Sequence, residues 1–259
     1  GGGTPTTSGS GSQTGSGGPS DSSVPGPGPV TGGTPGGRLV VGFAGSDPVS
    51  FDPPVGYSAL DYDVVTELVY FGSLLAYQDQ AGGPMPNIAK AMPEVSSDGM
   101  TLRFTLRDDV KFHNGRVITA EDFKWSWERM LSPSLKGSWG QSYLSTIAGA
   151  DAVANGKAKE LTGVTVLSPT SLQIKLTQPD FTILNALATP LTAPVPKEEV
   201  QRLGDTQFGK TPVGYGPYRI DSYDEQNQRA IFKRFADYMY PGLPYLDEVE
   251  LRWGIDENL

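Results

Sequence analysis

Apolar and polar residues alternate most strictly in residues 101–107. Three apolar side chains there point to one side of an extended chain and four polar side chains to the other, which predicts a strand buried on one face. The Asn114-Gly115 pair that follows predicts a tight turn, because both residue types tolerate a positive φ. The apolar positions of the strand are Leu102, Phe104 and Leu106.

A helix is predicted to begin directly after Thr119. The Thr119 hydroxyl can accept a hydrogen bond from the third helical residue, Asp122, in a variant of the capping box. Glu121 and Asp122 also face the positive end of the helix dipole. Apolar residues then recur at spacings of three and four, so one face of the helix is apolar. These residues are Phe123, Trp127, Met130 and Leu131.

Similar patterns predict a mixture of strands and helices over residues 38–253. Residues 1–37 differ, because they are almost all Gly, Ser, Thr and Pro, with Asp21 as the single charge. Such a segment buries too little apolar surface to offset its ordering entropy, so we expect a flexible tether. The predicted strands are 38–44, 74–78, 163–167, 171–177, 218–223, 229–235 and 247–253, and the predicted helices are 60–71, 141–147, 148–155, 181–188 and 198–203.

Composition narrows the function classes. The 259 residues suffice for one or two domains with their own cores. A net charge of −9 argues against a nucleic-acid partner, and the absence of cysteine excludes disulfides and thiolate metal sites. No apolar run is long enough to span a bilayer. The chain does not start with a signal peptide, so we expect any such peptide to have been removed or left out.

Three motifs suggest chemistry but have simpler explanations. Residues 204–211 match the P-loop pattern literally, yet a P-loop needs a following helix, and the prolines and glycines after Thr211 prevent one. His113 is the only histidine, so we assign it a structural role rather than a role as a metal ligand or a general base. Glu121 and Asp122 are explained by helix capping. No nucleophile motif is present, and we therefore predict no enzyme activity, no metal and no cofactor.

Four aromatic residues lie within a short span of the sequence. Most of them belong to a predicted core, since one tryptophan falls on the apolar face of the helix after Thr119. Trp139 and Tyr143 are candidates to border a ligand cleft, where aromatic rings supply contact area. The four residues are Trp125, Trp127, Trp139 and Tyr143.

The stretch SDGMTLRFTLRDDVKFHNGRVITAEDFKWSWERM resembles the signature region of the family 5 extracellular solute-binding proteins. Residues 86–91 (PNIAKA) resemble the element that precedes this region in the family. Gly214-Tyr215-Gly216-Pro217-Tyr218 is similar to the family's Gly-Thr-Gly-Pro-Tyr turn, with Tyr215 in place of Thr. Asp237–Gly242 is similar to a further family segment, with Met239 in place of Trp. The resemblance runs from about Arg38 to Trp253.

The resemblance implies a fold and a division into units. We expect an α/β, periplasmic-binding-protein-like (type II, class C) first lobe, a mixed sheet with flanking helices, whose second lobe is missing. Family members are considerably longer, so the chain corresponds to an excised fragment, a truncated gene product or half of a protein. Within the lobe, we expect a ligand-binding subdomain of residues 38–57 plus 161–259 and an additional subdomain of residues 58–160.

The resemblance also implies a binding site and partners. In the family, the loop after the first strand lines the ligand cleft, so Ala44, Gly45, Ser46 and Asp47 are candidate ligand contacts beside Trp139 and Tyr143. Tyr215 is a further candidate. The implied function is capture of a peptide or similar small solute and delivery to the transmembrane subunits of an ABC permease. Nickel complexes and oligosaccharides remain alternative solutes.

The same resemblance implies a location outside the cell membrane or in the periplasm. We expect a monomer whose only membrane attachment is a lipid anchor on a cysteine preceding residues 1–37. Two other function classes remain open. One is a surface adhesion or signalling module that keeps the fold without transport, and the other is a surface hydrolase, although no nucleophile–base pair supports it.

Overall fold

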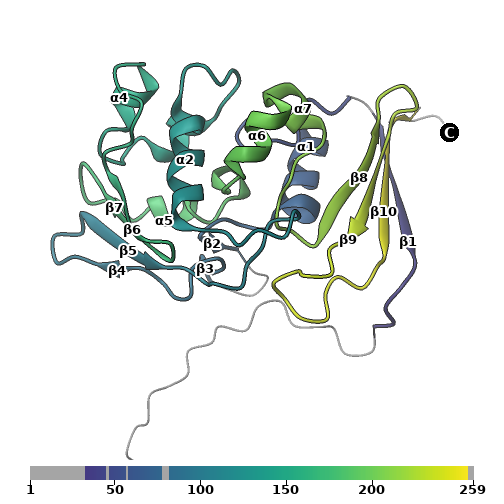
Figure 1. Cartoon of the computed structure of the whole chain (residues 1–259), viewed down its shortest axis with the longest axis horizontal. Helices are drawn as coiled ribbons and strands as arrows, with labels where there is room; N and C mark the ends of the chain where they lie inside the picture. The colour runs from purple at the N-terminus through teal and green to yellow at the C-terminus, as the bar shows by residue number, and fades with distance from the viewer. Residues whose placement is uncertain (1–32, 45–46, 57, 78–81, 256–259) are drawn as a thin grey trace, which may run out of the picture.

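In the computed structural model, residues 33–44, 47–56, 58–77 and 82–255 are described. Four strands form a sheet at one end of the molecule (Figure 1). Its order is β1-β10-β9-β8, with β1 parallel to β10 and the other neighbours antiparallel. All four strands were predicted. They are β1 (Arg38–Ala44), β8 (Tyr218–Asp224), β9 (Arg229–Arg234) and β10 (Glu248–Ile255).

A second sheet lies at the other end and is entirely antiparallel in the order β4-β5-β7-β6. The predicted alternation of β5 is confirmed, since Leu102 pairs with Ile174 and Phe104 with Leu172 on the buried face. A two-stranded hairpin stands apart from both sheets. The strands are β4 (Glu94–Val95), β5 (Thr101–Thr105), β6 (Val164–Ser168) and β7 (Ser171–Lys175), and the hairpin is β2 (Leu75–Ala76) with β3 (Met85–Pro86).

This pairing does not follow the predicted division of the lobe. Strand β7 pairs with β5 along its whole length, so residues 164–175 share a sheet with residues 94–105. A boundary at residues 160 and 161 would cut through that sheet. The sequence pattern shows that β6 and β7 are strands, but it does not show which strand they pair with.

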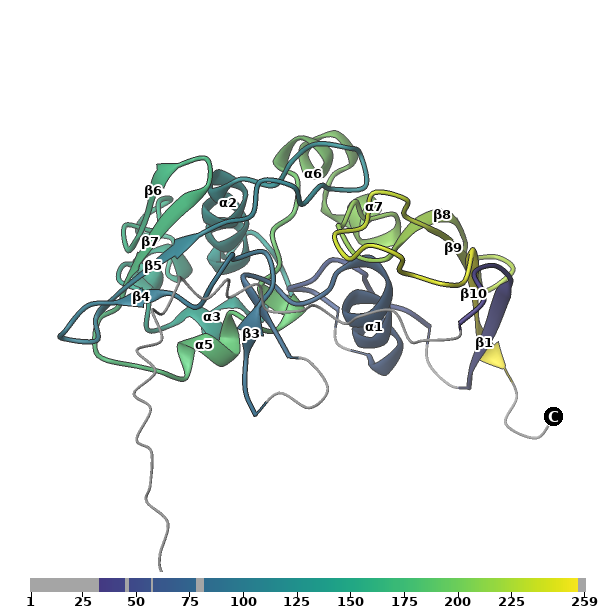
Figure 2. The same ribbon diagram turned by 90° about the horizontal axis from the view of Figure 1, so that it is seen from below.

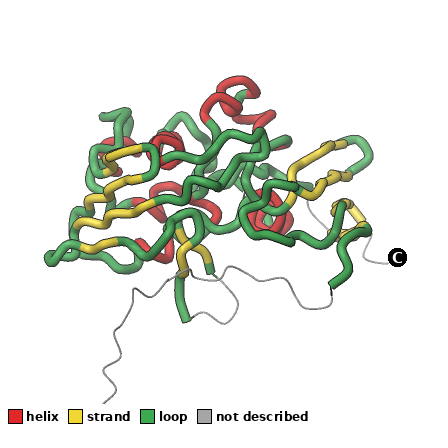
Figure 3. The backbone as a smooth tube through the Cα atoms, turned by 60° about the horizontal axis from the view of Figure 1, so that its bottom comes forward, coloured by secondary structure: helices red, strands yellow, loops and turns green. Residues whose placement is uncertain are grey.

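The predicted helix after Thr119 is α2 (Ala120–Leu131), the longest of the described helices. The predicted helix 60–71 is α1 (Ala59–Asp63), which continues as the π-helical turn η1 (Val64–Val69). The remaining helices are α3 (Gly140–Leu144), α4 (Ala150–Ala154), α5 (Ile183–Ala186), the 3₁₀ turn η2 (Pro190–Thr192), α6 (Lys197–Leu203) and α7 (Asp205–Lys210). Helices α1, α6 and α7 lie between the two sheets, and α2 and α4 stand over the second sheet (Figure 1). Figure 3 shows the strands of the two sheets, in yellow, at opposite ends of the molecule.

Helix α7 was not predicted, and it occupies the residues that match the P-loop pattern. Its backbone groups bond within the helix, as the Phe208 N–H donates to the Gly204 carbonyl over 2.9 Å. Packing leaves no room for a side chain at Gly209, because a Cβ on it would lie 2.4 Å from the Ser50 hydroxyl oxygen. The segment therefore has no strand–loop–helix arrangement that could cradle a phosphate.

One continuous cluster of buried side chains joins the two sheets through the helices. It contains Phe104 of the second sheet, Trp127 of α2, Phe208 of α7 and Phe232 of the first sheet. Because the core is shared, displacement of α2 or α7 would disturb both ends of the molecule.

Candidate ligand-binding site

The structure describes residues 47–56 of the loop after β1, and a buried carboxylate holds residues 49 and 50 in place. Asp61 accepts hydrogen bonds from the backbone N–H groups of Val49 (2.8 Å), Ser50 (3.2 Å) and Ser58 (3.1 Å). The Ser58 hydroxyl in turn accepts from the Asp61 N–H, which completes a capping box at the start of α1. This part of the loop is thus tied directly to a helix end.

The same loop is bound to the last turn of α2 by a salt bridge. Arg129 donates two hydrogen bonds to the Asp52 carboxylate, of 3.2 and 2.5 Å, and two to Asp205 of α7, of 3.2 and 2.7 Å. The Asp52 side chain is 1% exposed and that of Arg129 9%. Burial raises the pKa of Asp52, and the guanidinium of Arg129 opposes that shift. A paired buried carboxylate of this kind fixes position more than it adds stability.

Aromatic side chains gather beside this loop. The backbone N–H of Trp139 donates to the Pro54 carbonyl over 3.1 Å, and the Trp139 side chain is exposed. Tyr143 lies one helical turn later in α3. Tyr62 of α1 is also exposed, and burial together with the nearby Tyr143 raises the pKa of Tyr62. We call Tyr62, Trp139 and Tyr143 the aromatic face.

Helices α1 and α3 and the end of β10 lie toward the same side of the molecule, the lower side in Figure 2. Strand β1 runs parallel to β10, so their last residues, Ala44 and Ile255, lie side by side at the same end of the first sheet. A cavity of about 330 Å³ lies beside the loop after β1. It is lined by Val49, Ser50, Asp52, Val55, Ser134, Leu135, Lys136, Asp205, Thr206 and Lys210.

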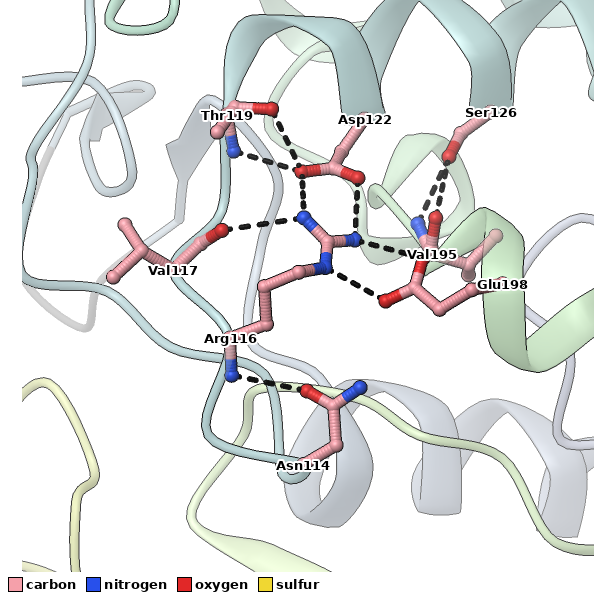
Figure 4. A network of polar contacts seen from close by, with 8 residues as sticks. All are labelled: Asn114, Arg116, Val117, Thr119, Asp122, Ser126, Val195 and Glu198. Atoms are coloured by element: carbon pink, nitrogen blue, oxygen red, sulfur yellow. Dashed lines mark hydrogen bonds and ion pairs between the residues drawn. The ribbon is translucent and has the colours of Figure 1, made fainter.

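A second arginine network surrounds the start of α2 (Figure 4). Arg116 donates to both carboxylate oxygens of Asp122, over 2.9 and 2.7 Å, and to Glu198 of α6, over 2.7 and 3.2 Å. Asp122 also accepts from the backbone N–H and the hydroxyl of Thr119, over 2.8 and 3.0 Å. The predicted helix start after Thr119 is confirmed, with the Asp122 carboxylate bonding back to Thr119, and the Asp122 N–H donates to the Thr119 carbonyl over 3.1 Å. Ser126 continues the connection by bonding both the N–H and the carbonyl of Val195.

His113 holds a turn through both of its ring nitrogens. The backbone N–H of Gly214 can only donate, so Nδ1 accepts from it over 3.2 Å and Nε2 carries the proton that is donated to the Gly216 carbonyl over 3.0 Å. Burial lowers the pKa of His113 to about 4, against the opposing effect of the Gly216 hydrogen bond. The imidazole is therefore neutral and both of its ring nitrogens are hydrogen-bonded, as expected for a structural histidine.

The glycines of this turn are required by a close approach. The Val69 carbonyl accepts hydrogen bonds from the N–H groups of Tyr215 (3.0 Å) and Gly216 (2.8 Å). A Cβ on Gly214 would lie 2.0 Å from that carbonyl oxygen. Tyr215 itself is buried, and its hydroxyl donates to the Gly72 carbonyl over 2.7 Å.

Three of the predicted site residues, Ala44, Asp47 and Trp139, lie on or beside the loop after β1. Ala44 ends β1, and Asp47 is exposed in the following loop, where Gln228 donates to it over 3.4 Å. Trp139 lies against the same loop. Tyr215 lies elsewhere, in the core between η1 and β8, so its side chain is not on the aromatic face. Tyr143 belongs to the aromatic face, and Gly45 and Ser46 lie outside the described residues.

Sequence reasoning missed Tyr62 and Arg129. Tyr62 precedes the apolar positions of a helix, and nothing in its neighbourhood marks it as a contact residue. Arg129 lies near the end of the signature region, but its partners Asp52 and Asp205 lie 77 and 76 residues away. Asp52 stands in the short element Phe51-Asp52-Pro53, which carries no sign of a pairing with Arg129.

No metal site or membrane span is found within the described ranges. In that part of the chain, no group of three or more His, Asp or Glu side chains is arranged to hold a metal ion. No described helix is long and apolar enough to cross a membrane.

Residues 83–258 match the family model described as bacterial extracellular solute-binding proteins, family 5 Middle. The chain belongs to this family. It is 30% identical over 216 residues to the dipeptide-binding protein DppE of Bacillus subtilis, covering 82% of this chain and 38% of DppE. It is 32% identical over 200 residues to the periplasmic oligopeptide-binding protein OppA of Escherichia coli, covering 75% and 35%.

Solved structures of the family have the same fold. The murein tripeptide binding protein MppA of Escherichia coli superposes with a TM-score of 0.72 at 27% identity, covering 83% of this chain and 41% of MppA. AgaA of A. tumefaciens R10, in complex with agropinic acid, superposes at 0.71 and 28% identity, covering 86% and 40%. The chain thus spans well under half the length of these family members, and the predicted α/β, periplasmic-binding-protein-like fold of one lobe is confirmed.

Proposed function

We propose that this chain is part of the extracellular substrate-binding component of an ABC importer, and that it captures peptides. The observation that carries the proposal is the match over most of the chain to relatives named for dipeptides and oligopeptides. The proposed location is the outer face of the cell membrane or the periplasm, with transfer of the ligand to permease transmembrane subunits. The Gly, Ser, Thr and Pro composition of residues 1–37 supports a spacer next to a lipid anchor.

The proposed binding face combines a fixed loop with aromatic contact area. The loop after β1 offers backbone groups to an extended peptide, which gives affinity with little dependence on the peptide's side chains. The aromatic face supplies apolar contact through rigid rings. A ligand held between this face and the remainder of the protein would favour the closed state of a hinge.

Capture by this chain alone is expected to be weak. If the whole protein binds at about 1 μM, the binding free energy is roughly −8 kcal/mol. With half of the contacts missing, about −4 kcal/mol remains, which corresponds to a dissociation constant of about 1 mM. A micromolar binding isotherm for residues 1–259 alone would contradict this expectation.

Native mass spectrometry tests the proposal most simply. The protein from its complete reading frame is purified without denaturation and mixed with a tryptic digest of casein. We expect a ladder of peptide adducts, and we expect the adducts to disappear when the protein is unfolded and refolded without peptide. An intact protein that takes up no peptide from this digest or from its source cell would contradict peptide capture.

A second solute class is favoured by one observation. AgaA, which is 28% identical to this chain, was solved with agropinic acid rather than a peptide. The same mass measurement distinguishes the two classes, because adducts of a small non-peptide solute carry one mass instead of a ladder. Metabolic labelling with a radioactive fatty acid tests the lipid anchor separately, and absence of label from the mature protein would contradict it.

A further inference from the structure

We propose that Arg129 is a positioning residue for ligand capture, which holds the loop after β1 and the aromatic face in one fixed relation. The inference rests on the proposed function for its meaning. Its geometry, however, stands on contacts that involve no ligand. Arg129 lies in the last turn of α2, where the helix meets both parts of the candidate site.

The first part is the loop after β1. The Asp52 carboxylate is bound by Arg129 through two parallel hydrogen bonds, which set its orientation as well as its place. The Asp52 carbonyl accepts from the N–H groups of Val55 (3.0 Å) and Gly56 (3.2 Å), and its own N–H donates to the Ser50 hydroxyl over 3.2 Å. Fixing Asp52 therefore fixes the turn of residues 52–56.

The second part is the segment of residues 138–143, which carries Trp139 and Tyr143 of the aromatic face. The Met130 carbonyl, one residue after Arg129, accepts a hydrogen bond from the Ser138 hydroxyl. Gly140 packs so closely on the same helix end that a Cβ would lie 2.6 Å from the Met130 carbonyl oxygen. The N–H of Trp139 then reaches across to the Pro54 carbonyl. The end of α2 thus sets the place of Trp139 relative to the turn of residues 52–56.

Lysine cannot replace this arginine. A guanidinium presents a planar fork that bonds Asp52 and Asp205 at once, while an ammonium is a compact point charge. In Arg129→Lys the charge remains, so Asp52 keeps a cationic partner. The paired geometry is lost, and the turn of residues 52–56 is free to shift against α2.

Arg116 provides a matched control. It also makes forked bonds to two carboxylates, Asp122 and Glu198, at the other end of the same helix. Neither partner lies in the loop after β1 or on the aromatic face. Arg116→Lys should therefore loosen the start of α2 without moving the candidate site.

Hydrogen exchange measured by mass spectrometry tests the positioning without any ligand. In the protein from its complete reading frame, Arg129→Lys is expected to speed amide exchange in residues 47–56 by about tenfold, because the turn of residues 52–56 loses its bond to α2. Exchange in residues 132–143 should rise through Trp139, whose N–H donates to Pro54 of that turn. Arg116→Lys is expected to leave both segments unchanged. Equal exchange in the two variants, or an effect of Arg129→Lys spread over the whole chain, would overturn the inference.

Peptide binding provides the functional readout. For a casein peptide that binds the wild-type protein, Arg129→Lys should weaken affinity by about tenfold and Arg116→Lys by less than about twofold. Asp52→Asn, which keeps the shape but removes the charge, should reproduce the Arg129→Lys effect. If the wild-type protein binds no peptide, the proposed function fails, while the exchange experiment still decides the positioning role.

Discussion

Arg116 and Arg129 stand near the two ends of α2, and each bonds two carboxylates. Arg116 joins Asp122, six residues away, to Glu198 of α6, and its side chain is 36% exposed. Arg129 joins Asp52, 77 residues away, to Asp205 of α7, and its side chain is 9% exposed. Two similar pairings therefore serve different purposes, since the first closes a helix start and the second ties distant segments together.

The difference shows that the two ends of one helix have different roles. At its start, α2 is stabilised by residues of its own signature region, and this end is visible in the sequence. At its end, the same helix contacts the loop after β1 through Arg129 and residues 138–140 through Met130. The parts of the chain proposed to contact ligand are joined by contacts between residues far apart in the sequence, such as Arg129 and Asp52.

Removing each guanidinium should give the largest contrast. Arg129→Ala leaves the Asp52 carboxylate buried without its partner, and we expect a loss of about 3–5 kcal/mol in the free energy of unfolding. Arg116→Ala removes a half-exposed partner and should cost about 1–2 kcal/mol. Urea denaturation followed by circular dichroism measures both. Equal losses would remove the distinction between the two ends.

A change of pH should alter the stability of the protein through His113, which lies in the signature region. The folded pKa of about 4 lies below the ordinary value of 6.5, so the unfolded state binds the proton more readily. Stability is therefore expected to fall as the pH is lowered from about 6.5 to 4, by up to about 3 kcal/mol. His113→Gln should flatten this part of the stability–pH curve. An unchanged slope in that variant would show that other groups cause the loss.

Two tryptophans test whether the aromatic face binds ligand. Trp139→Ala should weaken peptide affinity by about five- to tenfold with little effect on stability, because its ring is exposed beside the loop. Trp125→Ala is the matched control, since Trp125 lines a different hollow between α2 and residues 153–160. Isothermal titration calorimetry measures both affinities. A loss of affinity in Trp125→Ala equal to that in Trp139→Ala would place the ligand elsewhere.

The smallest effects are expected from the outer carboxylates of the two networks. The side chains of Glu198 and Asp205 are about half exposed, at 48% and 56%. Glu198→Gln and Asp205→Asn should each change the free energy of unfolding by about 0.5 kcal/mol, because exposed ion pairs contribute little. Thermal melts at low and high salt measure the difference. A change in Asp205→Asn as large as in Arg129→Ala would mean that Asp205, not Asp52, is the important partner.

The sequence predicted what short-range patterns control. The strand at residues 101–105, the turn before Thr119 and the capped helix α2 depend on neighbours a few residues apart. The pairing of β7 with β5 does not, so the division at residues 160 and 161 was placed without it. Helix α7 was missed because glycines at both ends of its pattern disfavour a helix, and only the contact of Gly209 with Ser50 explains one of them.

The candidate site shows the same limit. Trp139 was chosen from its sequence neighbours and lies on the aromatic face, whereas Tyr215 was chosen from a motif and lies in the core. Asp52 is part of a recognisable element, but its role depends on Arg129. A residue whose effect is exerted through a partner 77 positions away leaves no local pattern.

The most direct test is hydrogen exchange of the protein from its complete reading frame, with and without a bound casein peptide. We predict that the peptide slows exchange in residues 47–56 and 132–143 and leaves residues 111–122, around Arg116, unchanged. Protection of residues 111–122 without protection of the other two segments would contradict it, because the ligand would then bind at the wrong end of α2.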